Sequence, residues 1–125
     1  YTPTTREVVN EYVAYTMIDL MKGVSDGGTG SWIRTKYNIT SEVAGKTGTA
    51  ENPHGKDHAV FIGYAPLENP QIAVAVVVEN AGFGATWAAP IASLMIEQYL
   101  TGEIKRKDLK NRIANAVINE SVKIW

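Results

Sequence analysis

Three segments of the chain have the hydrophobic pattern of β-strands, and they follow one another closely. They span Val43 to Ala50, Ala59 to Ala65 and Gln71 to Glu79. The links between them are short and polar and contain proline, so we expect an antiparallel meander. The third segment is a nearly continuous apolar run, which is typical of a strand buried on both faces. We therefore expect helices on both sides of this sheet.

One helix is predicted before the strands and one after them. Thr4 and Glu7 have the spacing of a capping box, which predicts the start of the first helix, and Gly23 is expected to end it. The second helix is expected over Thr86 to Thr101, with Gly102 as its terminator. The first helix is expected to belong to the core through an apolar stripe of Val9, Val13, Met17, Leu20 and Val24. The inward residues expected of the second helix are Ile91, Leu94, Met95 and Tyr99. The pattern thus predicts the α/β (α+β) class, a three-stranded antiparallel meander covered by helices.

The last segment, residues 104–125, is predicted to be a basic amphipathic tail. Its apolar residues recur at helical intervals, and we expect its positive charges to form a solvated face. These charges belong to Lys105, Arg106, Lys107, Lys110 and Arg112.

The charge and composition of the chain limit the classes of function. Its 125 residues include 12 basic and 13 acidic side chains, so the net charge of -1 provides no field that would attract nucleic acid. There is no cysteine, which excludes disulfides and thiolate metal sites. No apolar stretch approaches the ~20 residues of a membrane-spanning helix. A start at Tyr1 instead of methionine is compatible with a piece of a longer protein and with ordinary processing.

The first strand is the best candidate for chemistry. Side chains alternate along a strand, so Thr47 and Thr49 share one face while Lys46 leaves from the other. Gly48 lies between the two threonines, and a glycine inside a strand often marks a close approach of a ligand or another backbone. Without further context, the alternative is a polar edge strand that lysine and threonine protect from aggregation.

A phosphate-binding loop is the first rival explanation, because Gly45-Lys46-Thr47 copies the end of that motif. The motif also needs an earlier glycine, where this chain has Thr40, and a helix directly afterwards. Two further strands follow instead. The pattern therefore disfavours nucleotide binding.

The two histidines, His54 and His58, suggest a metal site or a catalytic base together with Asp57. However, Asp57 and His58 are neighbours at the start of a strand, so their side chains should point to opposite faces. We expect a local structural hydrogen bond instead.

In its setting, Gly45 to Ala50 resembles the third active-site motif, Lys-Thr-Gly, of the penicillin-binding proteins and serine β-lactamases. The resemblance extends over roughly residues 8–102. The chain is similar to the elongation-type class B enzymes, penicillin-binding protein 2. The features that carry the resemblance are Asp57-His58, Phe61 to Pro66, Asn69-Pro70, Glu79-Asn80 and Ala88 to Ile91. The same features disfavour a β-lactamase. The resemblance implies that residues 1–103 are the C-terminal portion of a transpeptidase domain with a β-lactamase/transpeptidase-like fold.

The resemblance implies a serine-type D,D-transpeptidase, which cross-links peptidoglycan stem peptides in cell-wall synthesis and binds β-lactam antibiotics. Lys46 and Thr49 would be catalytic, Lys46 through its positive charge and Thr49 through a backbone N–H in the oxyanion hole. Thr47, Gly48 and Thr49 would bind substrate, the two hydroxyls through its terminal carboxylate. The family implies no cofactor and no metal.

The nucleophile motifs of the family, Ser-x-x-Lys and Ser-x-Asn, do not occur in this chain. None of its five serines fits either motif: Ser25, Ser31, Ser41, Ser93 and Ser121. We therefore expect the chain alone to be inactive and to take no covalent penicillin label. The alternative is a non-catalytic β-lactam sensor or structural binding module of the same fold.

The resemblance also implies partners and a location. The rest of the parent transpeptidase chain is one partner, and nucleic acid is not. The last strand would have an unpaired edge, so we expect Ile72 to Val78 to pair with a second copy, to be capped by the tail, or to be covered in a larger assembly. The location implied is the extracytoplasmic, periplasmic face of the bacterial inner membrane, with the anchor in a segment absent from this chain.

Overall fold

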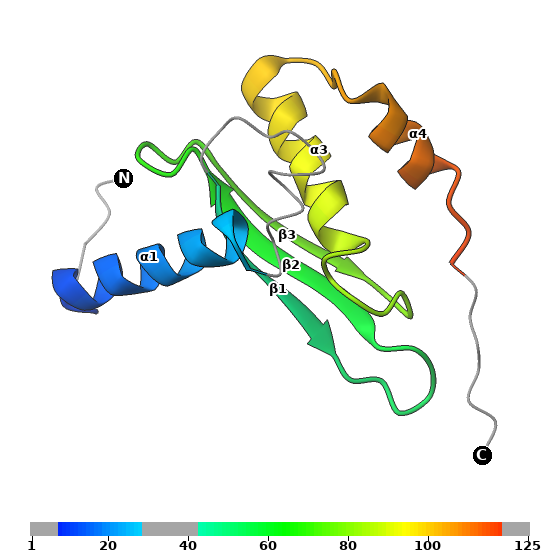
Figure 1. The fold of residues 1–125 in the computed structure, drawn as a ribbon, viewed down its shortest axis with the longest axis horizontal. Helices are drawn as coiled ribbons and strands as arrows, with labels where there is room; N and C mark the ends of the chain where they lie inside the picture. Colours follow the sequence, from blue (N-terminus) through cyan, green and yellow to red (C-terminus); the bar gives the residue numbers. More distant parts are fainter. Residues whose placement is uncertain (1–7, 29–42, 119–125) are drawn as a thin grey trace, which may run out of the picture.

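The fold was analysed in a computed structural model that describes residues 8–28 and 43–118. A three-stranded sheet forms the centre, with α3 lying across it (Figure 1). The expected combination of a meander with helices is confirmed. The elements are α1 (Glu11–Asp26), β1 (Ala44–Ala50), β2 (His58–Ala65), β3 (Ile72–Val78), α3 (Ala88–Thr101) and α4 (Lys107–Ala114).

The sheet is an antiparallel meander in the order β1-β2-β3, as predicted. Its register places Thr47 of β1 opposite Phe61 of β2, and Phe61 opposite Val76 of β3. Within the described residues, the outer edges of β1 and β3 have no strand partner.

The core lies between one face of the sheet and α3. Phe61 and Val76 are buried there against the small residues that begin α3, among them Ala89 and Ala92. The opposite face of β3 is exposed, and Val77 retains 62% of its surface. The expectation that β3 is buried on both faces is therefore wrong for the described residues. The apolar sequence of β3 suggested burial on both faces, but α1 contacts β1 and does not cover the second face of β3.

Helix α1 begins later and ends later than the sequence suggested. The side chain of Asn10 caps it by accepting a hydrogen bond of 2.8 Å from the backbone N–H of Tyr12. The predicted capping box at Thr4 lies outside the described residues. The predicted stop at Gly23 is wrong, since the helix continues to Asp26 and the carbonyl of Gly23 accepts the closing bond from the N–H of Gly27.

Most of the apolar stripe of α1 is exposed within the described residues, and only Val24 is half-buried. Val13, Met17 and Leu20 each keep about half or more of their surface. The helix contacts the sheet at β1 and otherwise extends beyond it (Figure 1). The expectation that α1 is a core helix covering the sheet is therefore wrong here, because the helix lies beside the sheet and not over it.

Helix α3 ends as predicted, at Gly102, which adopts the left-handed conformation with φ of 79° and donates its N–H to the carbonyl of Gln98. Leu94 is buried, as expected, and Ile91 is half-buried. Met95 and Tyr99 are exposed, so their expected inward position is wrong. The small residues Ala88, Ala89 and Ala92, together with Ser93 and Ile96, form the buried face instead.

The basic tail contains the predicted helix, α4, which packs on α3 through Leu109 and Leu94. One of its five charges is not solvated as expected. Arg106 forms a 3.0 Å ion pair with Glu97, and the two side chains are only 16% and 14% exposed. An apolar groove of about 480 Å³ lies between α3, α4 and Ile72, and it is lined in part by Met95 and Tyr99. Within the described ranges, no helix is both long enough and apolar enough to cross a membrane.

Candidate active site

The Lys-Thr-Gly strand is β1, at one edge of the described sheet. Thr47 and Thr49 pair with Phe61 and Ala59, whose side chains face α3. Lys46 pairs with Ile62 on the opposite face. The two hydroxyl residues therefore share a face, and the lysine lies on the other.

The two threonines differ in exposure. Thr47 is only 6% exposed, whereas the side chain of Thr49 is open to solvent. Lys46 is exposed, and its ammonium group donates a hydrogen bond to the backbone carbonyl of Thr47. This bond holds the ammonium group of Lys46 close to the backbone of its own strand.

The two glycines of this strand have different surroundings. A Cβ added to Gly45 would lie 2.6 Å from the Cζ of Phe61 and 2.9 Å from the carbonyl oxygen of Ile62. A Cβ added to Gly48 would meet only the Cβ of Val60, at 3.6 Å, which is an ordinary contact. Gly45 is therefore required by packing. Gly48 leaves open space on the face of the strand that carries Lys46.

Gly84 lies directly on the motif strand. A Cβ added there would be 2.6 Å from the carbonyl oxygen of Gly48 and 2.3 Å from that of Val60. Gly48 has no side chain and that of Val60 belongs to the other face, so no side chain of this pair keeps Gly84 away from the backbone. Our sequence reasoning missed this contact, although the glycine in the loop before α3 was a signal for it.

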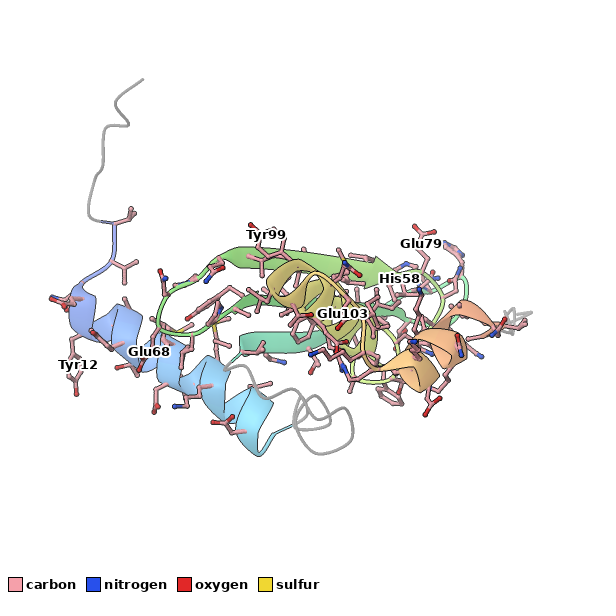
Figure 2. All side chains as sticks on the ribbon, turned by 90° about the horizontal axis from the view of Figure 1, so that it is seen from above. Tyr12, His58, Glu68, Glu79, Tyr99 and Glu103 are labelled. Carbon is pink, nitrogen blue, oxygen red and sulfur yellow. The ribbon has the colours of Figure 1, made fainter. Side chains whose placement is uncertain are left out.

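A polar network joins the loop after β1 to the loop after β3. The Nδ1 atom of His58 accepts a hydrogen bond of 3.1 Å from the backbone N–H of Asn80. The side chain of Asn52 donates to Oδ1 of Asn80 at 2.6 Å, and the N–H of Asn52 donates to the Asp57 carboxylate at 3.2 Å. Figure 2 shows His58 and Glu79, which precedes Asn80, together at one end of the sheet.

His58 therefore makes a structural hydrogen bond, as expected, but the bond is not local, since its partner Asn80 lies 22 residues away. The sequence revealed neither this partner nor the bond between Asn80 and Asn52. His54 is exposed in the same loop. Among the described residues, no group of three or more histidine, cysteine, aspartate or glutamate side chains could hold a metal ion.

A nucleophile is the component that the described site does not contain. Ser93 is 1% exposed, and its hydroxyl donates to the carbonyl of Pro90 while accepting from Arg106. It cannot reach a substrate at β1. The strand offers an ammonium group, an exposed hydroxyl and an open glycine. Such groups can bind a carboxylate and stabilise a developing negative charge.

Comparisons with known proteins identify the family of this chain. Residues 2–97 match the family model described as the penicillin binding protein transpeptidase domain. The chain is 45% identical over 110 residues to the peptidoglycan D,D-transpeptidase PbpA of Mycobacterium tuberculosis, covering 78% of this chain and 21% of that protein.

Two solved structures have the same fold. Pseudomonas aeruginosa PBP2 in complex with WCK 5153 is 39% identical with a TM-score of 0.60, and the match covers 72% of this chain and 20% of that one. Penicillin-binding protein A of M. tuberculosis, as a ceftriaxone acyl-enzyme complex, is 36% identical with a TM-score of 0.66, covering 77% and 23%. The chain therefore spans about a fifth of the length of these relatives.

Proposed function

The chain belongs to the penicillin-binding protein transpeptidase family, and from this premise we propose that it is part of a peptidoglycan D,D-transpeptidase, here called the parent enzyme. This enzyme cross-links stem peptides and is acylated by penicillins. The chain contributes the Lys-Thr-Gly strand, and the nucleophilic serine comes from elsewhere in the parent. The names of the relatives support this proposal, since they include a D,D-transpeptidase and a β-lactam acyl-enzyme complex.

The proposed reaction has two steps. The serine oxygen of the parent attacks the carbonyl carbon of the penultimate D-alanine. The C–N bond to the terminal D-alanine breaks, and its nitrogen takes up the proton that the serine hydroxyl gives up, so that D-alanine leaves as the free amine. An amine of a neighbouring stem peptide then attacks the ester carbon of the acyl-enzyme. The new C–N bond is the cross-link, the ester C–O bond breaks, and one amine proton returns to the serine oxygen.

In this reaction the backbone N–H of Thr49 supplies one donor to the oxyanion. Such a donor typically contributes about 3 kcal/mol of transition-state stabilisation. The hydroxyls of Thr47 and Thr49 bind the terminal carboxylate of the substrate, and Lys46 adds positive charge next to the catalytic serines. Gly48 leaves room for the substrate. The observation that carries the proposal is the Lys-Thr-Gly strand at an open sheet edge, with Thr49 exposed.

The proposal extends to the organisation and location of the parent. Residues 1–103 form the C-terminal portion of its transpeptidase domain, and residues 104–125 form a tail, of which helix α4 packs on α3. The remainder of the parent, or a second copy of the chain, covers the edge of Ile72–Val78 that has no strand partner among the described residues. The enzyme acts on the periplasmic face of the inner membrane, where stem peptides are cross-linked.

The test is acylation of the parent enzyme by a fluorescent penicillin, with the adduct located by mass spectrometry. We expect an adduct on a serine outside this chain, and release of D-alanine from a stem-peptide substrate. Lys46→Met should slow acylation about 100-fold, since it removes a charge next to the reacting groups. Lys110→Met, on the exposed surface of α4, is the matched control. Absence of an adduct, or an adduct on a serine of this chain, would refute the proposal. Acylation without D-alanine release would instead identify a non-catalytic sensor.

A further inference from the structure

The hydrogen bond from the Asn80 N–H to the imidazole of His58 connects two loops that are distant in sequence. Asn80 has a positive φ of 55°, a left-handed conformation that asparagine tolerates better than most residues. Its side chain is held by Asn52 at 2.6 Å, so both its backbone and its side chain are fixed. The start of the loop between β3 and α3 is therefore anchored to the start of β2.

The same loop is anchored a second time and then reaches the motif strand. The N–H of Gly82 donates to the carbonyl of Asp57 at 2.7 Å. Two residues later, Gly84 lies against the backbone of Gly48, and the carbonyl of Gly84 accepts the first bond of α3 from Ala89 at 2.9 Å. The position of Gly84 thus depends on the anchors on one side and on α3 on the other.

We propose that His58 and Asn80 are positioning residues of the transpeptidase site, which hold Gly84 against the Gly48 backbone and so fix the place of the Thr49 N–H. The inference rests on the proposed function. Neither residue touches the substrate. They act through the loop, because any shift of Gly84 changes the support beneath the peptide that links Gly48 to Thr49.

The chemistry of His58 makes the inference testable. The bond is made through the Nδ1 atom, which accepts the hydrogen bond from the Asn80 N–H with its lone pair. An asparagine at this position places an amide oxygen where Nδ1 is, whereas a glutamine places its polar atoms near the position of Nε2. His58→Asn should therefore keep the bond to Asn80, and His58→Gln should lose it.

The experiment compares these variants in the parent enzyme. Fluorescent penicillin kinetics separate the non-covalent affinity from the acylation rate constant, and thermal unfolding reports folding. We expect His58→Gln to lower the acylation rate constant about tenfold with little change in affinity, since small displacements of catalytic groups are costly. His58→Asn should stay within about threefold of the unmodified enzyme. His54→Asn, in the same loop but exposed, is the matched control.

Gly84→Ala tests the other end of the connection. Its added methyl group would press on the Gly48 carbonyl, and we expect a similar loss in the acylation rate constant. Equal acylation by His58→Asn and His58→Gln would overturn the inference, as would losses that simply follow the melting temperature across all variants. Failure of the unmodified parent to be acylated would refute the proposed function itself, which distinguishes the two failures.

Discussion

The aromatic ring of Phe61 lies over Gly45, close enough that an added Cβ would be 2.6 Å from its Cζ atom. Gly63, the register partner of Gly45, is under the same ring, and an added Cβ there would be 3.0 Å from it. A large buried ring thus occupies the space that two missing side chains leave. This packing links the motif strand to the core beneath α3.

Substitution of the two glycines of the motif strand should therefore separate folding from activity. Gly45→Ala forces the Phe61 ring to move, and we expect it to destabilise the parent enzyme by about 1–3 kcal/mol. Gly48→Ala meets no close atom in the described structure, so its effect on stability should stay within about 0.5 kcal/mol. We expect it to slow acylation instead, because the methyl group would occupy space proposed for substrate. Chemical denaturation and penicillin kinetics measure the two effects. Equal stability losses would contradict the prediction.

Removal of the Thr49 hydroxyl should weaken substrate recognition without unfolding the protein. In Thr49→Val the backbone donor remains, while a hydrogen bond to a carboxylate is lost. Such bonds contribute about 1.5–3 kcal/mol, so we expect the non-covalent affinity for penicillin to fall about tenfold to 100-fold. Thr101→Val, at an exposed threonine that ends α3 and lies outside the site, is the control. If affinity is the same in both variants, Thr49 does not bind the carboxylate.

The ion pair between Arg106 and Glu97 should contribute measurably to stability. The guanidinium group also donates to the hydroxyl and carbonyl of Ser93, at 3.1 and 2.8 Å. Arg106→Met leaves a nearly buried carboxylate and a buried carbonyl without these donors, and we expect a loss of about 2 kcal/mol.

The pair Lys105–Glu103 provides the control for this experiment. Its charges are 4.0 Å apart and 70% exposed, so Lys105→Met should change the free energy of unfolding by less than about 0.5 kcal/mol. Denaturant unfolding of both variants in low and high salt would test this. A loss for Arg106→Met no larger than that of the control would show that the tail is not held by this pair.

Local patterns in the sequence were sufficient to predict much of the fold. Proline-containing links between apolar segments predicted the meander, and Gly102 predicted the end of α3 because a left-handed terminal residue favours glycine. Burial was predicted less well. Val77 and Met17 are apolar residues in a strand and a helix whose type was correctly predicted, yet both are exposed here. An apolar pattern predicts that a surface is buried against other residues. It does not show whether those residues belong to the described part of the chain or to another part of the protein.

The local features of the candidate site could likewise be predicted from the sequence, whereas its long-range contacts could not. Alternation along one strand sufficed to group Thr47 with Thr49, since it depends only on neighbouring residues. The contacts of Gly84 with Gly48, and of Asn80 with His58, join segments more than 20 residues apart, as the numbering shows. No periodicity encodes such pairs. A glycine or an asparagine in a loop indicates special backbone geometry, and only the three-dimensional structure identifies what it contacts.

The exposed stripe of α1 leads to a final prediction. Leu20 is 62% exposed in the described structure, although apolar residues recur along this helix at core spacing. The chain spans about a fifth of its relatives, and we therefore expect the rest of the parent enzyme to cover the stripe.

Leu20→Ala should then behave as a core substitution in the parent and cost about 2–4 kcal/mol. Asp19→Ala, at the neighbouring exposed position, should change stability by less than about 0.5 kcal/mol. Denaturant unfolding of the parent and both variants measures the difference. If Leu20→Ala costs no more than Asp19→Ala, the stripe is solvent-exposed in the parent as well, and the prediction is wrong.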